Sequence, residues 1–104
     1  MTTLEYASLP GRARRDLKAR AKTRSVDLRV GRKGVTANLL AELRAIFENE
    51  ELVKVGFIHP ERSERSTLLA ELEDKLAASS VAVAGKTATL YKPLAKQEHG
   101  AKPS

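Results

Sequence analysis

The stretch LRVGRKGVTANLL, residues 28–40, passes from the pattern of a strand to the pattern of a helix within a few residues. The strand pattern begins earlier, because apolar and charged side chains alternate in residues 25–30, SVDLRV, as they do in a strand with one buried face. After the loop GRKG, residues 31–34, Thr36 is placed to cap a helix whose apolar residues recur at helical spacing to about residue 49. This stretch therefore predicts a strand, a glycine loop and a helix in direct succession.

The rest of the chain continues this alternation of helices and strands. The predicted elements are a helix over 9–23, the strand over 25–30, a helix over 36–49, a strand over 51–58, a third helix with Leu68, Leu69, Leu72 and Leu76 buried, and strands over 80–84 and 87–91. Ser8 is the predicted cap of the first helix, and Ser63 or Ser66 that of the third, after a polar loop over 59–66. Gly85 and Lys86 join the last two strands as a hairpin turn.

This order of elements predicts the fold class, a compact two-layer α/β sandwich with a mixed four-stranded sheet. Strand–helix–strand units require right-handed crossovers and parallel neighbours, whereas the final hairpin adds an antiparallel pair. Residues 1–8 and 95–104 carry no periodic apolar pattern. We therefore expect a single domain over 9–94 between a flexible N-terminus and a flexible C-terminal tail.

The charges are segregated along the chain, whose formal net charge is +6. Ten lysines and arginines lie between Arg12 and Lys33 with only two acids among them, whereas nine of the thirteen acids lie between Glu42 and Asp74. A segment with this density of bases favours a polyanionic partner, nucleic acid first, over a helix face that is merely solvated.

The glycine loop places two bases directly before a helix N-terminus. Glycine adopts positive φ and has no Cβ, so the backbone can approach a ligand, and the helix N-terminus attracts phosphate. The loop is thus suited to gripping a sugar-phosphate backbone, although a lone pair of glycines could equally form only a tight turn. The predicted RNA-binding residues are Gly31, Arg32, Lys33, Gly34, Arg12, Arg14, Arg15, Lys18, Lys22, Arg29 and Lys86. We expect the loop and the arginine-rich helix to converge in one surface.

Three segments together resemble the CRM (chloroplast RNA splicing and ribosome maturation) domain, in its bacterial stand-alone YhbY-like form. They are VGRKGVT before a leucine-rich helix, ELVKV after it, and GKTATLYKP near the end. The resemblance implies a fold related to the C-terminal domain of translation initiation factor 3, RNA binding through the G-x-x-G loop, and association with precursors of the large ribosomal subunit. Family members commonly carry an Ala-His pair and a Leu-Lys-Pro before the first strand. Residues 19–30, ARAKTRSVDLRV, contain neither, and the extra arginines could substitute electrostatically.

Motifs for other chemistry fail on spacing or context. The GKT at 85–87 lacks the glycine of a Walker A motif five residues earlier, where Ser80 stands, and it precedes a predicted strand instead of a helix. His59 and His99, in a chain without cysteine, make no metal-ligand pattern. Tyr91 fits base stacking and packing at the sheet edge equally well.

We therefore expect a non-catalytic RNA-binding protein, monomeric and cytoplasmic, with no cofactor and no metal. Its expected partner is ribosomal RNA or a pre-ribosomal particle, and no apolar stretch is long enough to span a bilayer. The sequence has many lysines and arginines but no clear aromatic platform for stacking nucleobases. This combination indicates that the protein recognises the backbone and shape of an RNA more than its sequence. The alternatives are a protein–protein interaction module of the translation machinery, whose charge serves solubility, and a small nucleotide-using enzyme.

Overall fold

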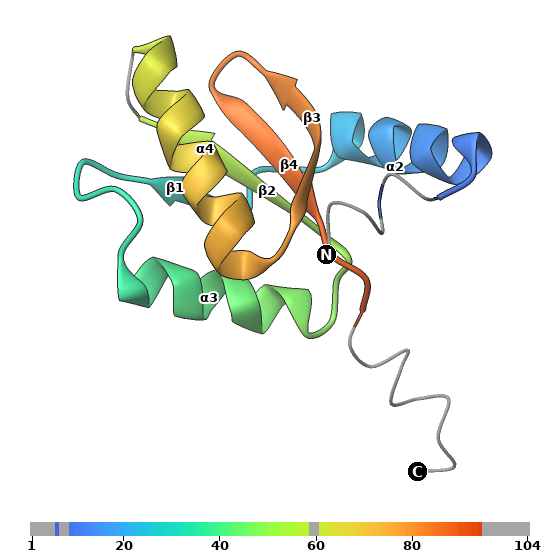
Figure 1. Cartoon of the computed structure of the whole chain (residues 1–104), viewed down its shortest axis with the longest axis horizontal. Coiled ribbons are helices and arrows are strands. Elements are labelled where there is room, and N and C mark those ends of the chain that lie inside the picture. The colour runs from blue at the N-terminus through green and yellow to red at the C-terminus, as the bar shows by residue number, and fades with distance from the viewer. Residues whose placement is uncertain (1–5, 7–8, 59–60, 95–104) are drawn as a thin grey trace, which may run out of the picture.

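The computed structural model of the chain describes Tyr6 and residues 9–58 and 61–94. Its elements, in chain order, are α2 (Gly11–Thr23), β1 (Leu28–Val30), α3 (Ala37–Phe47), β2 (Leu52–Phe57), α4 (Arg62–Leu76), β3 (Ser79–Ala84) and β4 (Thr87–Tyr91) (Figure 1). The predicted alternation of helices and strands is confirmed, including the final hairpin.

The four strands form one mixed sheet in the order β1-β2-β4-β3. Strands β1 and β2 are parallel, with Leu28 opposite Val55 and Val30 opposite Phe57. Strand β4 runs antiparallel to both of its neighbours, β2 and β3. It therefore separates β2 from β3, which point the same way without touching. The predicted mixed four-stranded sheet is confirmed.

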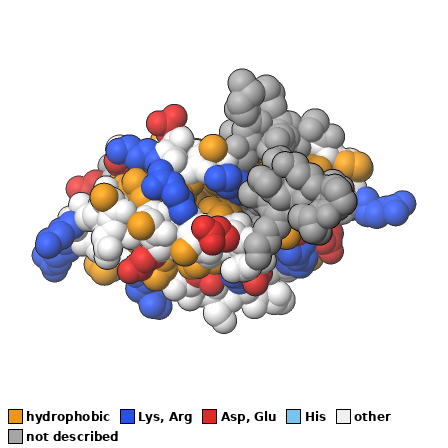
Figure 2. Space-filling model, turned by 90° about the horizontal axis from the view of Figure 1, so that it is seen from below, with side chains coloured by type: hydrophobic (Ala, Val, Ile, Leu, Met, Phe, Trp, Pro, Cys, Tyr) orange, Lys and Arg blue, Asp and Glu red, His pale blue; other side chains and the backbone are white. Residues whose placement is uncertain are grey.

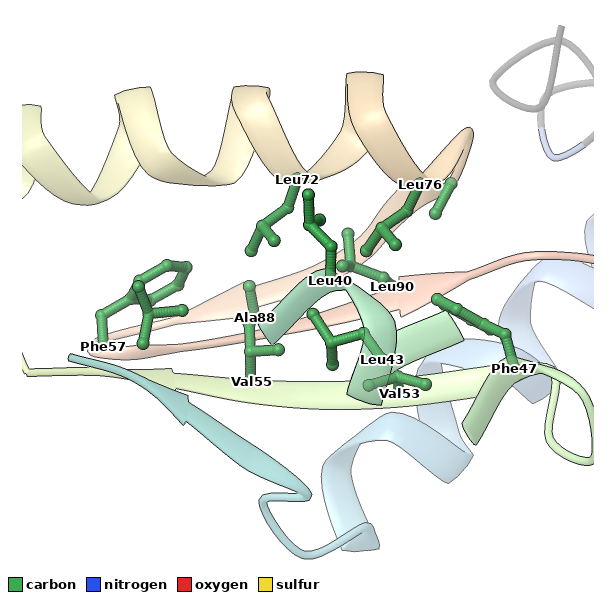
Figure 3. Packing of buried hydrophobic residues seen from close by; sticks show 12 residues of the cluster. Leu40, Leu43, Phe47, Val53, Val55, Phe57, Leu72, Leu76, Ala88 and Leu90 are labelled. Atoms are coloured by element: carbon green, nitrogen blue, oxygen red, sulfur yellow. The ribbon is translucent and has the colours of Figure 1, made fainter. Parts of the chain in front are cut away.

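The main core lies between one face of this sheet and the helices α3 and α4. Side chains of a strand alternate between the two faces, so every second residue of β2 and β4 points to these helices. Figure 3 shows Leu72 and Leu76 of α4 pointing toward the sheet, and the row of core residues between Phe57 at one end and Phe47 at the other. The buried members are Val30, Leu40, Leu43, Phe47, Val53, Val55, Phe57, Leu72, Leu76, Ala78, Ala88 and Leu90.

The helix α2 packs on the opposite face of the sheet. Its Leu17 and Ala21 contact a smaller cluster formed by Leu52, Val81 and Tyr91, against which Tyr6 and Leu9 also pack. The predicted apolar stripe of this helix is thus buried. The α/β class is confirmed, and α3, α4 and the sheet make the two predicted layers. Helix α2 adds to these layers on the other face of the sheet, where Leu52 and Tyr91 point away from the main core.

A polar network attaches the end of α2 to β2. Asp27 Oδ2 accepts hydrogen bonds from the Lys54 N–H at 2.8 Å and from Arg24 Nε at 2.9 Å. Lys54 Nζ in turn donates to the carbonyl oxygens of Ala21 and Arg24, each at 3.0 Å. Lys54 thus supplies donors at the C-terminal end of the helix, where carbonyls lack the regular intrahelical partner; the Ala21 carbonyl also accepts from the Arg24 N–H at 3.4 Å. Since the apolar stripe of α2 is narrow, this network fixes where the helix sits.

Several predicted boundaries change. Thr36 caps α3 as predicted, since its Oγ1 accepts from the Leu39 N–H at 3.1 Å. The caps predicted at Ser63 and Ser66 are wrong: α4 already begins at Arg62, after Glu61, and no side chain caps it. The charged residues before the leucines are good helix formers and extend the helix upstream into the predicted loop. The predicted cap Ser8 lies outside the described residues, and α2 begins at Gly11.

Candidate nucleic-acid interface

The glycine loop is a tight turn between β1 and α3. The Gly34 N–H donates to the Gly31 carbonyl at 3.0 Å, which closes the turn over Arg32 and Lys33. Gly34 has φ +75°, a conformation that side chains with a Cβ rarely adopt. Both basic side chains are exposed at the tip. The turn thus presents two cations away from the body of the protein, at one end of the sheet (Figure 1).

The loop shares its end of the molecule with α4 and the β3–β4 turn. The Ile58 N–H donates to the Val30 carbonyl at 3.2 Å, and the Phe57 N–H donates to the Lys86 carbonyl at 2.7 Å. These bonds bring the ends of β1 and β2 beside the hairpin turn. On the other side, a hollow of about 340 Å³ is lined by Arg32, Gly34 and the first half of α4. We call this region, residues 31–34, 62–69 and 85–86, the loop end.

A second hollow of about 270 Å³ lies beneath the loop. It is lined by Arg29, Arg32 and Lys33 together with residues of the α3 N-terminus and the acidic Glu42. Three cations against one carboxylate leave an excess of positive charge in which a phosphate is favoured. The predicted loop residues and Arg29 are therefore brought together.

Helix α2 carries the second set of predicted bases. Four exposed bases recur three or four residues apart on the side away from Leu17 and Ala21, and they extend along roughly 15 Å of helix at a rise of 1.5 Å per residue. These residues, which we call the α2 stripe, are Arg12, Arg15, Lys18 and Lys22.

The remaining arginines of this segment are engaged within the protein. Arg14 Nη1 donates to the Leu9 carbonyl at 2.8 Å, so this predicted RNA contact is turned toward the body of the protein. Arg20 Nη1 lies 2.7 Å from Glu51 Oε2, and this hydrogen bond raises the pKa of Arg20 above its usual value. Arg24 pairs with Asp27. Of these three arginines, only Arg14 was among the predicted RNA-binding residues.

The structure separates the loop from α2, which corrects the expectation that they converge. In Figure 1 they lie at opposite ends of the longest axis, and in Figure 2 Lys and Arg side chains reach out at both ends, with acidic and basic side chains mixed between them. The reason is strand direction: α2 packs near the start of β2, at Leu52, whereas the loop follows the end of the parallel β1. Arg29 belongs to the loop side, since it lines the hollow beneath the loop, and its Cγ would lie 3.4 Å from a Cβ on Gly56 near the end of β2.

The structure also decides between the alternatives for Tyr91 and for the GKT sequence at 85–87. Tyr91 is buried in the α2 cluster, 5.9 Å from Tyr6 between ring centroids, so packing is the alternative that the structure takes. Gly85 and Lys86 form a hairpin turn before β4, which excludes the Walker A context for the GKT sequence. His59 and His99 lie outside the described residues. Two bases of the loop end, Arg62 and Arg65, were missed because they were assigned to a loop; their spacing with Leu69 is helical.

Two further observations concern the described part of the chain. Among residues 6, 9–58 and 61–94, no three His, Cys, Asp or Glu side chains cluster as a metal would require. Within the same residues, no helix has both the length and the apolar character needed to cross a membrane.

Comparison with known proteins shows which family has this architecture. The model of the CRS1 / YhbY (CRM) domain matches residues 9–92, most of the chain. The solution structure of a hypothetical Staphylococcus aureus protein, described as a candidate RNA-binding protein, superimposes with a TM-score of 0.69. The two sequences are 24% identical, and the match covers 81% of this chain and 88% of the other, which shows a shared fold. The chain belongs to the CRS1 / YhbY (CRM) domain family.

Proposed function

We propose that this protein binds RNA without catalysing a reaction on it. The observation that carries the proposal is the loop end, where the exposed Arg32 and Lys33 project from a turn fixed by Gly34. Arg62 lines a groove at the same end, beside the hairpin turn of Gly85 and Lys86. Membership of the CRM family and the description of the Staphylococcus aureus protein support the same reading. We further propose a target, ribosomal RNA in precursors of the large subunit, and a role in their assembly in the cytoplasm.

Recognition would rest on phosphates and shape. All four aromatic side chains of the chain are at least partly buried: Phe47, Phe57 and Tyr91 are in the two cores, and Tyr6 packs on Tyr91. Within the described part of the chain, no exposed Phe or Tyr ring is therefore offered for stacking several nucleobases in a row. Each lysine or arginine that neutralises a phosphate releases counterions, so affinity should fall steeply with salt.

The separation of the two basic regions favours a folded RNA as ligand. The α2 stripe and the loop end lie at opposite ends of a molecule whose longest extent is 45 Å. One short helix of RNA would not reach both. We propose that the loop end makes the principal contact and that the α2 stripe contacts a second RNA segment.

The test is association with ribosomal particles in cells. Crosslinking followed by sequencing of the attached RNA should recover large-subunit ribosomal RNA, and the protein should leave the particles after nuclease or high salt. The rival function, docking on a protein of the translation machinery, predicts an association that survives both treatments. That result would overturn the proposal.

A further inference from the structure

A groove at the loop end is not used by the contacts proposed so far. It lies between α4 and the β3–β4 hairpin and has a volume of about 310 Å³. Its apolar floor is formed by Phe57, Leu69 and Val83. The volume is at the lower limit of roughly 300–1,000 Å³ that is typical of small-molecule sites.

The floor of this groove is apolar surface that the fold leaves uncovered. Val83 pairs with Ala88, a residue of the main core, so its side chain points to the side of the sheet that α4 covers. It is nevertheless 61% exposed, because α4 does not extend over the hairpin at this position. Figure 3 shows that Phe57, which also lines the groove, marks the end of the packed core.

The rim of the groove is cationic and polar. Arg62, Arg65 and Ser66 line it from α4, and among the described residues no acidic side chain lines it. The exposed Lys86 is next to Gly85, which closes the hairpin side. An occupant that complements this lining has a flat apolar part, hydrogen-bonding edges and negative charge close by. An unstacked nucleobase with its flanking phosphates has all three.

Only helix α4 separates the groove from the proposed loop contact. Arg62, Arg65 and Leu69 of α4 face the groove. Across the same helix, Arg32 shares a hollow whose lining from α4 includes one acid: Ser63, Glu64, Thr67 and Leu68. A strand held by the loop would cross only α4, about 10 Å in diameter, to reach the groove.

We infer that the groove binds one unstacked base of a single-stranded RNA segment whose backbone is held by the glycine loop. This inference rests on the proposed function and deepens it. The ligand class becomes a loop, bulge or end of a folded RNA, since the bases of a regular duplex are not free to enter.

The experiment compares two ligands that differ only in their bases. A uridine hexamer has free bases, and an abasic hexamer keeps the same phosphates and riboses. The wild-type protein should bind the uridine hexamer roughly tenfold more tightly than the abasic one, within the range found for single base contacts. Val83→Thr, which keeps the shape of the side chain and a β-branched residue in the strand, should bring this ratio close to one.

The matched control is Ala84→Thr, since the neighbouring residue pairs with Thr87 and points to the opposite face of the strand. It should keep the wild-type ratio. A ratio in Val83→Thr equal to that of the wild type would overturn the inference, as would a wild-type ratio of one. Thermal unfolding of both variants checks the fold, and methyl NMR on the wild type should show Val83 and Leu69 shifting with the uridine hexamer only.

The proposed function is tested separately by binding of a structured ribosomal RNA fragment. If the fragment binds but removal of the bases has no effect, the groove inference fails and the proposed function stands. If neither hexamer nor the fragment binds, the proposed function itself fails. Displacement of the uridine hexamer from Val83 by an apolar peptide would assign the groove to a protein partner instead.

Discussion

The loop end and helix α2 both present lysines and arginines, but they differ in how they are packed against the rest of the protein. The loop is backed by the main core: a Cβ on Gly34 would lie 3.4 Å from Leu68, whose helix buries Leu72 and Leu76 completely. Helix α2 is held by a small cluster around Leu17 and Ala21 and by the Asp27 network. The position of the loop is thus tied to the global fold, whereas α2 can loosen while the sheet stays folded.

This difference predicts two contacts of unequal kind. The loop end presents a turn of fixed shape, beside a groove, to a local feature of an RNA. The α2 stripe presents a line of charges on an exposed helix, which suits the backbone of an RNA of any sequence. The affinity for a short RNA should therefore depend on the loop end only, whereas the affinity for a folded RNA should depend on both the loop end and the α2 stripe.

The largest expected effect is charge reversal at the loop tip. Arg32→Asp with Lys33→Asp should weaken binding of a structured RNA roughly a hundredfold at moderate salt, because two phosphate contacts become repulsive. Circular dichroism should be unchanged, since both side chains are exposed. Electrophoretic retention of the RNA measures the effect, and undiminished retention would remove the loop from the interface.

A smaller effect is expected from releasing α2. Asp27→Ala leaves the Lys54 N–H without its acceptor and the Arg24 guanidinium with only its longer ion pair to Glu50, at 3.6 Å. The free energy of unfolding should fall by about 2 kcal/mol. Hydrogen exchange should accelerate in α2 and remain slow in α3 and α4. Asp16→Ala is the control, since its ion pair with Arg20, at 3.5 Å, is exposed and should cost less than about 0.5 kcal/mol. Equal losses for both variants would show that the network does not hold the helix.

Neutralising the α2 stripe should have a third, more selective effect. Replacing all four stripe residues, Arg12, Arg15, Lys18 and Lys22, by Gln should weaken the binding of a folded ribosomal RNA fragment about tenfold. It should also make the affinity less dependent on salt concentration. A short hairpin that reaches only the loop end should bind as before. Arg44→Gln with Lys75→Gln removes two positive charges outside both regions, against four in the stripe variant, so the losses are compared per charge removed. Equal losses for the short and the folded RNA would mean that both regions contact one segment, and the comparison of two ends would fail.

The features that could be predicted from the sequence are those that depend on residues close together in the chain. The cap at Thr36, the hairpin turn at Gly85 and the alternation of elements depend on neighbouring residues, and the structure confirms them. The separation of the loop from α2 depends on strand order and on which face Leu52 points to. Both are set by contacts between residues far apart in the chain, so charge counts along the sequence could not reveal them.

The individual arginines illustrate the same limit. Arg12 and Arg14 contribute equally to the count of basic residues. In the structure, however, Arg12 is exposed, whereas Arg14 donates a hydrogen bond to the Leu9 carbonyl. Helical spacing alone places Arg14 nearer the buried stripe of Leu17 and Ala21, so this distinction was available from the pattern. The engagement of Arg20 with Glu51 was not, because Glu51 reaches α2 only through the fold.

The smallest predicted effect distinguishes the two glycines of the loop. Gly34→Ala should lower the free energy of unfolding by about 1 kcal/mol, because φ +75° disfavours any residue with a Cβ. Gly31→Ala is the matched control: Gly31 does not have positive φ, and an added Cβ would meet nothing nearer than Ile58 at 4.0 Å. We expect it to be nearly neutral in urea unfolding. If Gly34→Ala also weakens RNA binding severalfold while Gly31→Ala does not, the shape of the turn contributes beyond its charge. Equal affinities would leave Arg32 and Lys33 acting as cations alone, and the loop end would then differ from the α2 stripe only in position.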